Sequence, residues 1–173
     1  MQLKVVQKYF TLFHSKFTVF DEGDNLVYTV EPEKRAVLRY RILDRDGNVL
    51  LIAKKRYFRF RKTFEILSPN DETVLYKVRK RVRIAKRFIF QDFTSDKIWD
   101  FRGNLFAYNF TMKKNGEMAI YFDKTFFTIR DTIKVDVVDQ EDMPLAVAMS
   151  AIIDTWFHQK KGSRWHIQLR GTR

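Results

Sequence analysis

The chain has 173 residues, 45% of them hydrophobic, which suits a single domain with a sizeable core. It contains no cysteine, which excludes disulfide bonds and thiolate metal sites. Its net charge is +12, and residues 34–90 hold 18 of the 33 Lys and Arg but only five of the 21 Asp and Glu. This concentration predicts a positive patch and anionic partners. The first residues show no secretory or transit signal, so we expect a cytoplasmic location.

Short alternating apolar runs, each followed by a turn signal, make up the first half of the chain. Three such units form a weak repeat: residues 17–30 around the turn 21–25, residues 38–53 around 44–48, and residues 64–78 around 68–72. Asp46-Gly47 is a strong hairpin signal because glycine accepts the positive φ that tight turns require. The first half therefore predicts three β-hairpins.

The second half continues with more short strands. We expect strands at 84–93, 98–101, 105–112, 118–122, 126–129 and 133–138, with turns at 95–97, 102–104 and 115–116. On this interpretation no glycine lies in the interior of an element.

One helix is predicted at residues 142–161, DMPLAVAMSAIIDTWFHQKK, and its apolar residues lie on every side. Asp142 suits the N-cap, Pro144 the first turn and Gly162 the stop. Its fifteen-residue apolar part would span only about 22 Å, short of a hydrocarbon core of about 30 Å, so we expect no transmembrane span. Beyond it, alternation at 163–170 predicts a further terminal strand.

Ten to twelve strands and one wholly apolar helix predict a mainly β protein with one buried α-helix. A flat sheet would cover only one side of such a helix, whereas a closed antiparallel β-barrel hides its edges and surrounds it. We therefore expect one domain, residues 1–173, in which about twelve strands enclose a central hydrophobic C-terminal helix.

The hairpins of the D-x-D-G-N type and the segment AVAMSAIIDTWF at 146–157 resemble the tubby-like superfamily. Within it, the chain is most similar to the LURP-one-related family, beside the tubby C-terminal domains and the phospholipid scramblases. The resemblance implies a closed barrel of about a dozen strands threaded by the helix. Tubby domains hold phosphoinositide headgroups on surface Lys and Arg, whereas the LURP-one-related branch implies no particular activity.

No pattern in the sequence indicates catalysis, a metal site or a cofactor. The three histidines are scattered, and neither a nucleophile motif nor a glycine-rich phosphate loop is present. The acidic segment 131–142 lies where scramblases resemble a calcium loop, but Ile133 and Val135 occupy positions where oxygen ligands are needed. We expect a binding module rather than an enzyme.

A polar stripe runs along the predicted helix, because Ser150, Asp154 and His158 are spaced four residues apart. We interpret it as a structural polar face that bonds to the barrel wall rather than as a catalytic triad. A buried carboxylate is costly without a partner, so Asp154 is expected to pair with an arginine, and Arg102 and Arg130 are the candidates.

The segment KVRKRVR at 77–83 gives the sharpest functional signal, because strand alternation would project its cations from one face. A second, shorter stripe lies at 59–61. The candidate ligand-binding residues are Lys77, Arg79, Arg81, Arg83, Arg59 and Arg61.

We expect these residues to bind anionic phospholipid or phosphoinositide headgroups at the cytoplasmic membrane surface. Nucleic-acid binding through the same patch and an acidic protein partner are the alternatives. The functionless interpretation is a solvated strand face that keeps the protein soluble.

Overall fold

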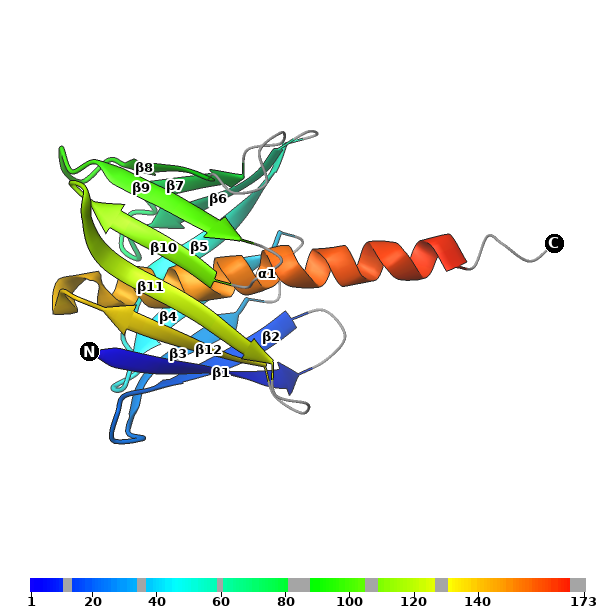
Figure 1. The fold of residues 1–173 in the computed structure, drawn as a ribbon, viewed down its shortest axis with the longest axis horizontal. Helices are drawn as coiled ribbons and strands as arrows, with labels where there is room; N and C mark the ends of the chain where they lie inside the picture. Colours follow the sequence, from blue (N-terminus) through cyan, green and yellow to red (C-terminus); the bar gives the residue numbers. More distant parts are fainter. Residues whose placement is uncertain are drawn as a thin grey trace.

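The computed structural model describes residues 1–10, 14–33, 37–58, 61–80, 88–104, 109–126 and 131–168. These residues form twelve strands, one 3-10 turn and one α-helix (Figure 1). The strands are β1 (Gln2–Phe10), β2 (His14–Phe20), β3 (Leu26–Pro32), β4 (Arg39–Asp44), β5 (Val49–Phe58), β6 (Arg61–Leu67), β7 (Val74–Lys80), β8 (Phe88–Asp92), β9 (Trp99–Asn104), β10 (Asn109–Lys114), β11 (Glu117–Phe126) and β12 (Asp131–Val137). The 3-10 turn η1 (Gln140–Asp142) leads into α1 (Met143–Gln168).

All twelve strands belong to one antiparallel sheet that curls into a nearly closed barrel, as predicted. The strand order is β8-β7-β6-β5-β4-β3-β2-β1-β12-β11-β10-β9, so β1 joins the last strand of the chain to the first hairpin. The two end strands, β8 and β9, meet through aromatic side chains: the ring centroids of Phe88 and Phe101 lie 4.6 Å apart, and those of Phe90 and Trp99 lie 5.6 Å apart. Side-chain packing thus closes this seam.

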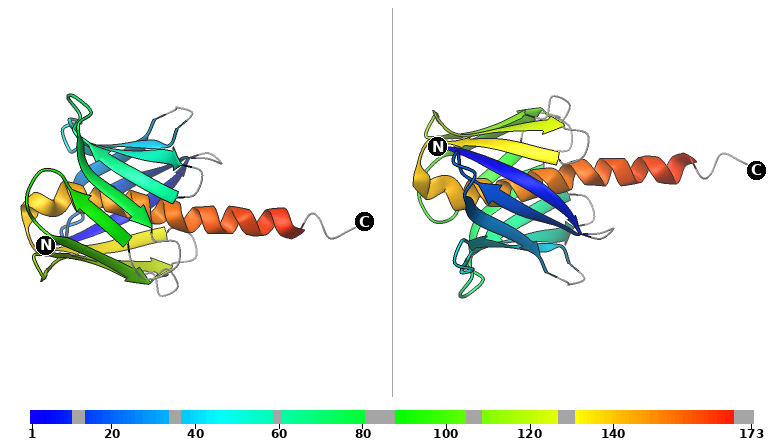
Figure 2. Two further views of the ribbon diagram at one scale, coloured as in Figure 1. Left: turned by 90° about the horizontal axis from the view of Figure 1, so that it is seen from above. Right: turned by 90° about the horizontal axis from the view of Figure 1, so that it is seen from below.

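The barrel encloses the first half of α1 (Figures 1 and 2), which confirms the buried helix. Every residue from Leu145 to Trp156 is buried, and the inward side chains of the strands form one core cluster with them. Trp156 stacks on Phe88 at 4.9 Å and meets Phe64 edge-on at 6.0 Å. Among the described residues, no helix is both long and apolar enough to cross a membrane.

The predicted hairpins form because their turn residues satisfy the local backbone. The Asp44 carboxylate accepts hydrogen bonds from the backbone N–H groups of Asp46 and Asn48 at 2.9 and 2.8 Å, and Gly47 adopts a φ of 87°. Asp21 accepts equivalent bonds from Gly23 and Asn25, both at 2.9 Å. These Asx turns set the register of the strands on either side.

The predicted terminal strand is wrong over residues 163–168, because α1 continues through Gly162 to Gln168. Residues 169 and 170 lie outside the described residues. A single glycine in a helix interior lowers helix stability by only about 1 kcal/mol, which is too little to end the helix. In addition, the two ends of the sheet already meet each other, so they offer no edge for another strand.

Two further corrections concern strands. Residues 102–104, predicted as a turn, belong to β9, where Gly103 pairs with Phe110 of β10. A side chain at 103 would collide with the Phe110 ring, which explains a glycine inside a strand. No strand was predicted at residues 2–10, yet β1 pairs with β12 and closes the barrel, with Leu3 and Val5 in the core.

Candidate functional site

Strand β7 alternates as the basic segment predicted. Val78 is fully buried in the core, whereas Lys77 and Arg79 lie on the outer face and are partly exposed. Arg61 begins β6, but its side chain is not described, and Arg59, Arg81 and Arg83 lie outside the described residues. The structure thus places two of the six candidate residues together on one surface.

The strand register places more cations beside these two. One cross-strand row contains Arg56, Thr63 and Arg79 on β5, β6 and β7, and the next contains Lys54, Glu65 and Lys77. Because neighbouring strands lie about 4.8 Å apart, the backbones of Arg56 and Arg79 are separated by roughly 10 Å, with Thr63 between them. We call the outer side of these two rows the β5–β7 face.

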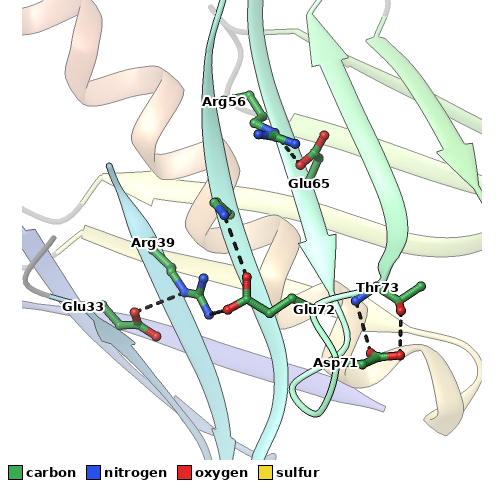
Figure 3. Close-up of polar contacts among 8 residues, drawn as sticks. Glu33, Arg39, Arg56, Glu65, Asp71, Glu72 and Thr73 are labelled. Atoms are coloured by element: carbon green, nitrogen blue, oxygen red, sulfur yellow. Dashed lines mark hydrogen bonds and ion pairs between the residues drawn. The ribbon is translucent and has the colours of Figure 1, made fainter. Parts of the chain in front are cut away.

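Glu65 partly neutralises the β5–β7 face. Its side chain is only 8% exposed, and its carboxylate pairs with Arg56 Nε at 2.7 Å and with Lys77 Nζ at 3.9 Å (Figure 3 shows the Arg56 contact). Arg79 has no ion pair within the part of the chain that the structure describes. Its guanidinium is therefore the cation best able to meet an outside anion.

Two further cations in the basic third of the sequence, Arg39 and Lys54, are held in ion pairs. Arg39 has a side chain only 6% exposed and pairs with Glu33 at 3.1 Å and with Glu72 at 2.7 Å (Figure 3). Lys54 Nζ lies 3.8 Å from the Glu72 carboxylate. The hydrogen bond to Glu72 and the two nearby carboxylates raise the pKa of Arg39. These pairs hold together the connections around β4 and are not available to a ligand.

The polar residues of α1 bond to the barrel wall and to the helix itself. The Ser150 hydroxyl donates to the Ala146 carbonyl at 2.9 Å, and the buried Asp154 carboxylate accepts a hydrogen bond from Gln7 Nε2 at 3.3 Å. Arg102 is not the partner of Asp154, because it is 59% exposed and pairs with Asp100 at 2.7 Å. The structure describes neither Arg130 nor the side chain of His158.

Next to Asp154, Thr155 Oγ1 lies 3.3 Å from the Tyr40 hydroxyl and donates to the Ala151 carbonyl at 2.9 Å. Burial raises the pKa of Tyr40 to about 12. Gln7 and Tyr40 were not predicted as partners of the helix. The signal for Gln7 is its place in the alternation Leu3, Val5, Gln7, which puts an amide on the inward face of β1.

A nearly closed antiparallel barrel of twelve strands with one buried C-terminal helix is the fold that the resemblance to the tubby-like superfamily implies. Within that superfamily the chain belongs to the LURP-one-related family, whose family model matches residues 1–154. The match covers every strand and the helix as far as Asp154. The comparisons with curated proteins and with solved structures give no match.

Proposed function

We propose that this protein is a non-catalytic binding module that recognises the phosphate-bearing headgroups of anionic phospholipids at the cytoplasmic surface of a membrane. The β5–β7 face is the binding surface, and Arg79 is its central residue. The observation that supports the proposal best is that Arg79 lies beside Arg56 and Lys77 without a carboxylate partner of its own among the described residues. A guanidinium suits a phosphate because its planar fork can donate two parallel hydrogen bonds.

The expected affinity of the β5–β7 face by itself is modest. Lys54 on this face is paired with Glu72. Arg56, Lys77 and Arg79 against Glu65 then leave two net positive charges, and each contributes about 1 kcal/mol near an anionic surface. About 2 kcal/mol corresponds to a preference of roughly 30-fold for anionic over neutral membranes. Further basic residues from the same third of the sequence, such as Arg81 and Arg83, would add to this preference.

The proposal can be tested by co-sedimentation of the purified protein with vesicles. Phosphatidylcholine vesicles are compared with vesicles that also contain phosphatidylserine or a phosphoinositide, with and without duplex DNA as competitor. Arg79→Glu changes the local charge by two and is expected to weaken binding to anionic vesicles by about 30-fold. The matched control is Lys134→Glu, which makes the same charge change at an exposed position on β12, on a distant part of the barrel.

Three results would overturn the proposal. The first is equal binding to neutral and anionic vesicles, and the second is equal loss in the Arg79 and Lys134 variants, which would reduce the effect to net charge. The third is displacement by DNA as complete as that by excess anionic vesicles, which would favour a nucleic-acid ligand.

A further inference from the structure

The connections at one end of the barrel are strongly acidic. Because the strands alternate in direction, the connections at the end where α1 begins are residues 21–25, 45–48, 68–73, 93–98, 115–116 and 138–142 (Figure 1). Their acidic residues are Asp21, Glu22, Asp24, Asp46, Asp71, Glu72, Asp96, Asp139, Glu141 and Asp142, against Arg45 and Lys97. We call this the acidic end, and it stands out in a chain of net charge +12.

The acidic end contains a cavity of about 270 Å³ between the β10–β11 hairpin and the segment that leads into α1. Met118 and Val138 form its apolar wall, and Glu117, Asp139 and Asp142 contribute carboxylates. Met118 is 45% and Val138 71% exposed. A cavity with this lining suits a side chain that combines an apolar stem with a positive charge.

An exposed apolar residue from another turn extends this surface. Ile98, 76% exposed, exchanges two hydrogen bonds with Asn115 of the hairpin: its backbone N–H donates to Asn115 Oδ1 at 2.9 Å, and its carbonyl accepts from the Asn115 N–H at 2.8 Å. On the other side, the Val138 N–H donates to the Ala119 carbonyl at 3.0 Å. Met118 and Val138 thus line the acidic cavity, and Ile98 is hydrogen-bonded to Asn115, another of its lining residues. Exposed apolar residues gathered in this way often mark protein contacts.

The charge of the cavity remains negative after its internal pairing. Lys114 Nζ lies 2.7 Å from Asp142 Oδ2, 3.8 Å from Asp139 Oδ2 and 5.5 Å from the centre of the Trp99 ring. Its side chain is only 16% exposed, so its charge is used in these internal contacts rather than presented to solvent. Asp139, 56% exposed, and the exposed Glu117 are left to face an outside cation.

The last part of α1 has a composition complementary to that of the cavity. Beyond Trp156, the last residue of the buried stretch, α1 continues for the three turns Phe157–Gln168, or about 18 Å, and leads away from the strands (Figures 1 and 2). This segment contains no Asp or Glu, and it includes the cations Lys160, Lys161 and Arg164 and the aromatic residues Phe157 and Trp165. It therefore combines apolar stems with positive charge.

We propose that the cavity at the acidic end receives residues 157–168 of a second copy of this chain, so that molecules associate end to end. The cavity is acidic and the helix segment is basic, and both contain apolar residues. One chain provides both, so they are always present at equal concentration. The helix leads away from the cavity of its own molecule, so the contact forms between copies. Such a contact is heterologous, which generates chains or rings rather than an isolated dimer.

Sedimentation velocity over a range of protein concentrations, at low and high salt, tests this proposal. The wild-type protein is expected to associate with rising concentration, and salt is expected to oppose it. A cavity variant, Glu117→Lys with Asp139→Lys, and a helix variant, Lys160→Glu with Lys161→Glu, should each associate at least about tenfold more weakly. Asp139 makes no side-chain cap bond to η1, so its replacement leaves that turn intact.

Mixing the two variants provides the decisive measurement, because each then meets a complementary surface on the other. We expect the mixture to associate although neither variant does so alone, which also shows that both are folded. Asp46→Lys, at the same end but outside the cavity, should behave as wild type. A wild-type protein that stays monomeric, variants that associate normally, a mixture that fails to associate or a defect in the Asp46 variant would each overturn the proposal.

Discussion

Replacing Glu65 by glutamine is expected to weaken the fold and at the same time strengthen binding to anionic vesicles. Glutamine keeps the shape and the hydrogen-bond acceptor but removes the negative charge that Arg56 and Lys77 share at 2.7 and 3.9 Å. The net charge of the β5–β7 face rises by one. At about 1 kcal/mol per charge near an anionic surface, vesicle affinity should rise about fivefold.

The loss of stability follows from burial. Glu65 is 8% exposed, whereas Arg56 and Lys77 are 51% and 40% exposed, so water partly screens the cations but hardly reaches the carboxylate. Replacing a charged hydrogen-bond acceptor by a neutral one under these conditions costs about 1–2 kcal/mol. For a chain of this size, that lowers the Tm by roughly 2–8 °C.

Vesicle co-sedimentation and thermal unfolding followed by circular dichroism measure the two effects on the same preparation. Glu141→Gln makes the same charge change at an exposed position of the acidic end and should alter neither quantity appreciably. A Glu65 variant that loses stability but binds vesicles no better than wild type would refute the placement of the lipid on the β5–β7 face. Equal gains in both variants would show an effect of total charge.

Three further predictions test the fold and its titrating groups. In Gly103→Ala, the new Cβ would lie 1.9 Å from a ring carbon of Phe110, so we expect a loss of about 1–3 kcal/mol in urea unfolding. Combining it with Phe110→Leu should cost less than the sum of the two single changes, and additive losses would contradict the contact. Tyr40 has its pKa raised to about 12 by burial, so the unfolded chain ionises first and stability falls as the pH rises from 10 to 12. Tyr40→Phe should remove this part of the alkaline loss, and an unchanged pH slope would argue against it. Partial burial tends to raise the pKa of Asp92, but hydrogen bonds from Thr94, Ser95 and Trp99 outweigh it and lower the pKa. The folding stability that ionised Asp92 contributes is therefore lost as the pH falls below 3.8. Asp92→Asn should flatten the acid limb of a plot of unfolding free energy against pH.

The features that sequence analysis predicted correctly depend on local chemistry. Asp46-Gly47 forms the expected hairpin because the positive φ of glycine and the Asx bonds of Asp44 act within five residues. The helix was recognisable because residues apolar on all sides must be surrounded, and that requirement together with many short strands leads to a barrel. The outward position of Lys77 and Arg79 follows from strand alternation alone.

The features that sequence analysis missed depend on register between distant strands. Whether Glu65 lies beside Arg56 and Lys77 is decided by how β6 pairs with β5 and β7, and no local pattern gives that pairing. The same is true of Arg39, whose partners Glu33 and Glu72 come from two different connections. Gly103 was assigned to a turn because its real reason, the Phe110 ring on the neighbouring strand, is invisible in the sequence.

The order of the elements along the chain has a consequence for synthesis on the ribosome. The helix that fills the barrel follows all twelve strands, and Val5 of β1 pairs with Ile133 of β12. At translation rates of about 5–20 residues per second, roughly 6–25 seconds separate the appearance of these two partners. During that interval the apolar faces of the early strands have neither their closing neighbour nor their core. The nascent chain is therefore exposed to aggregation until its last elements emerge, and its folding rate is limited by pairings between its two extremes.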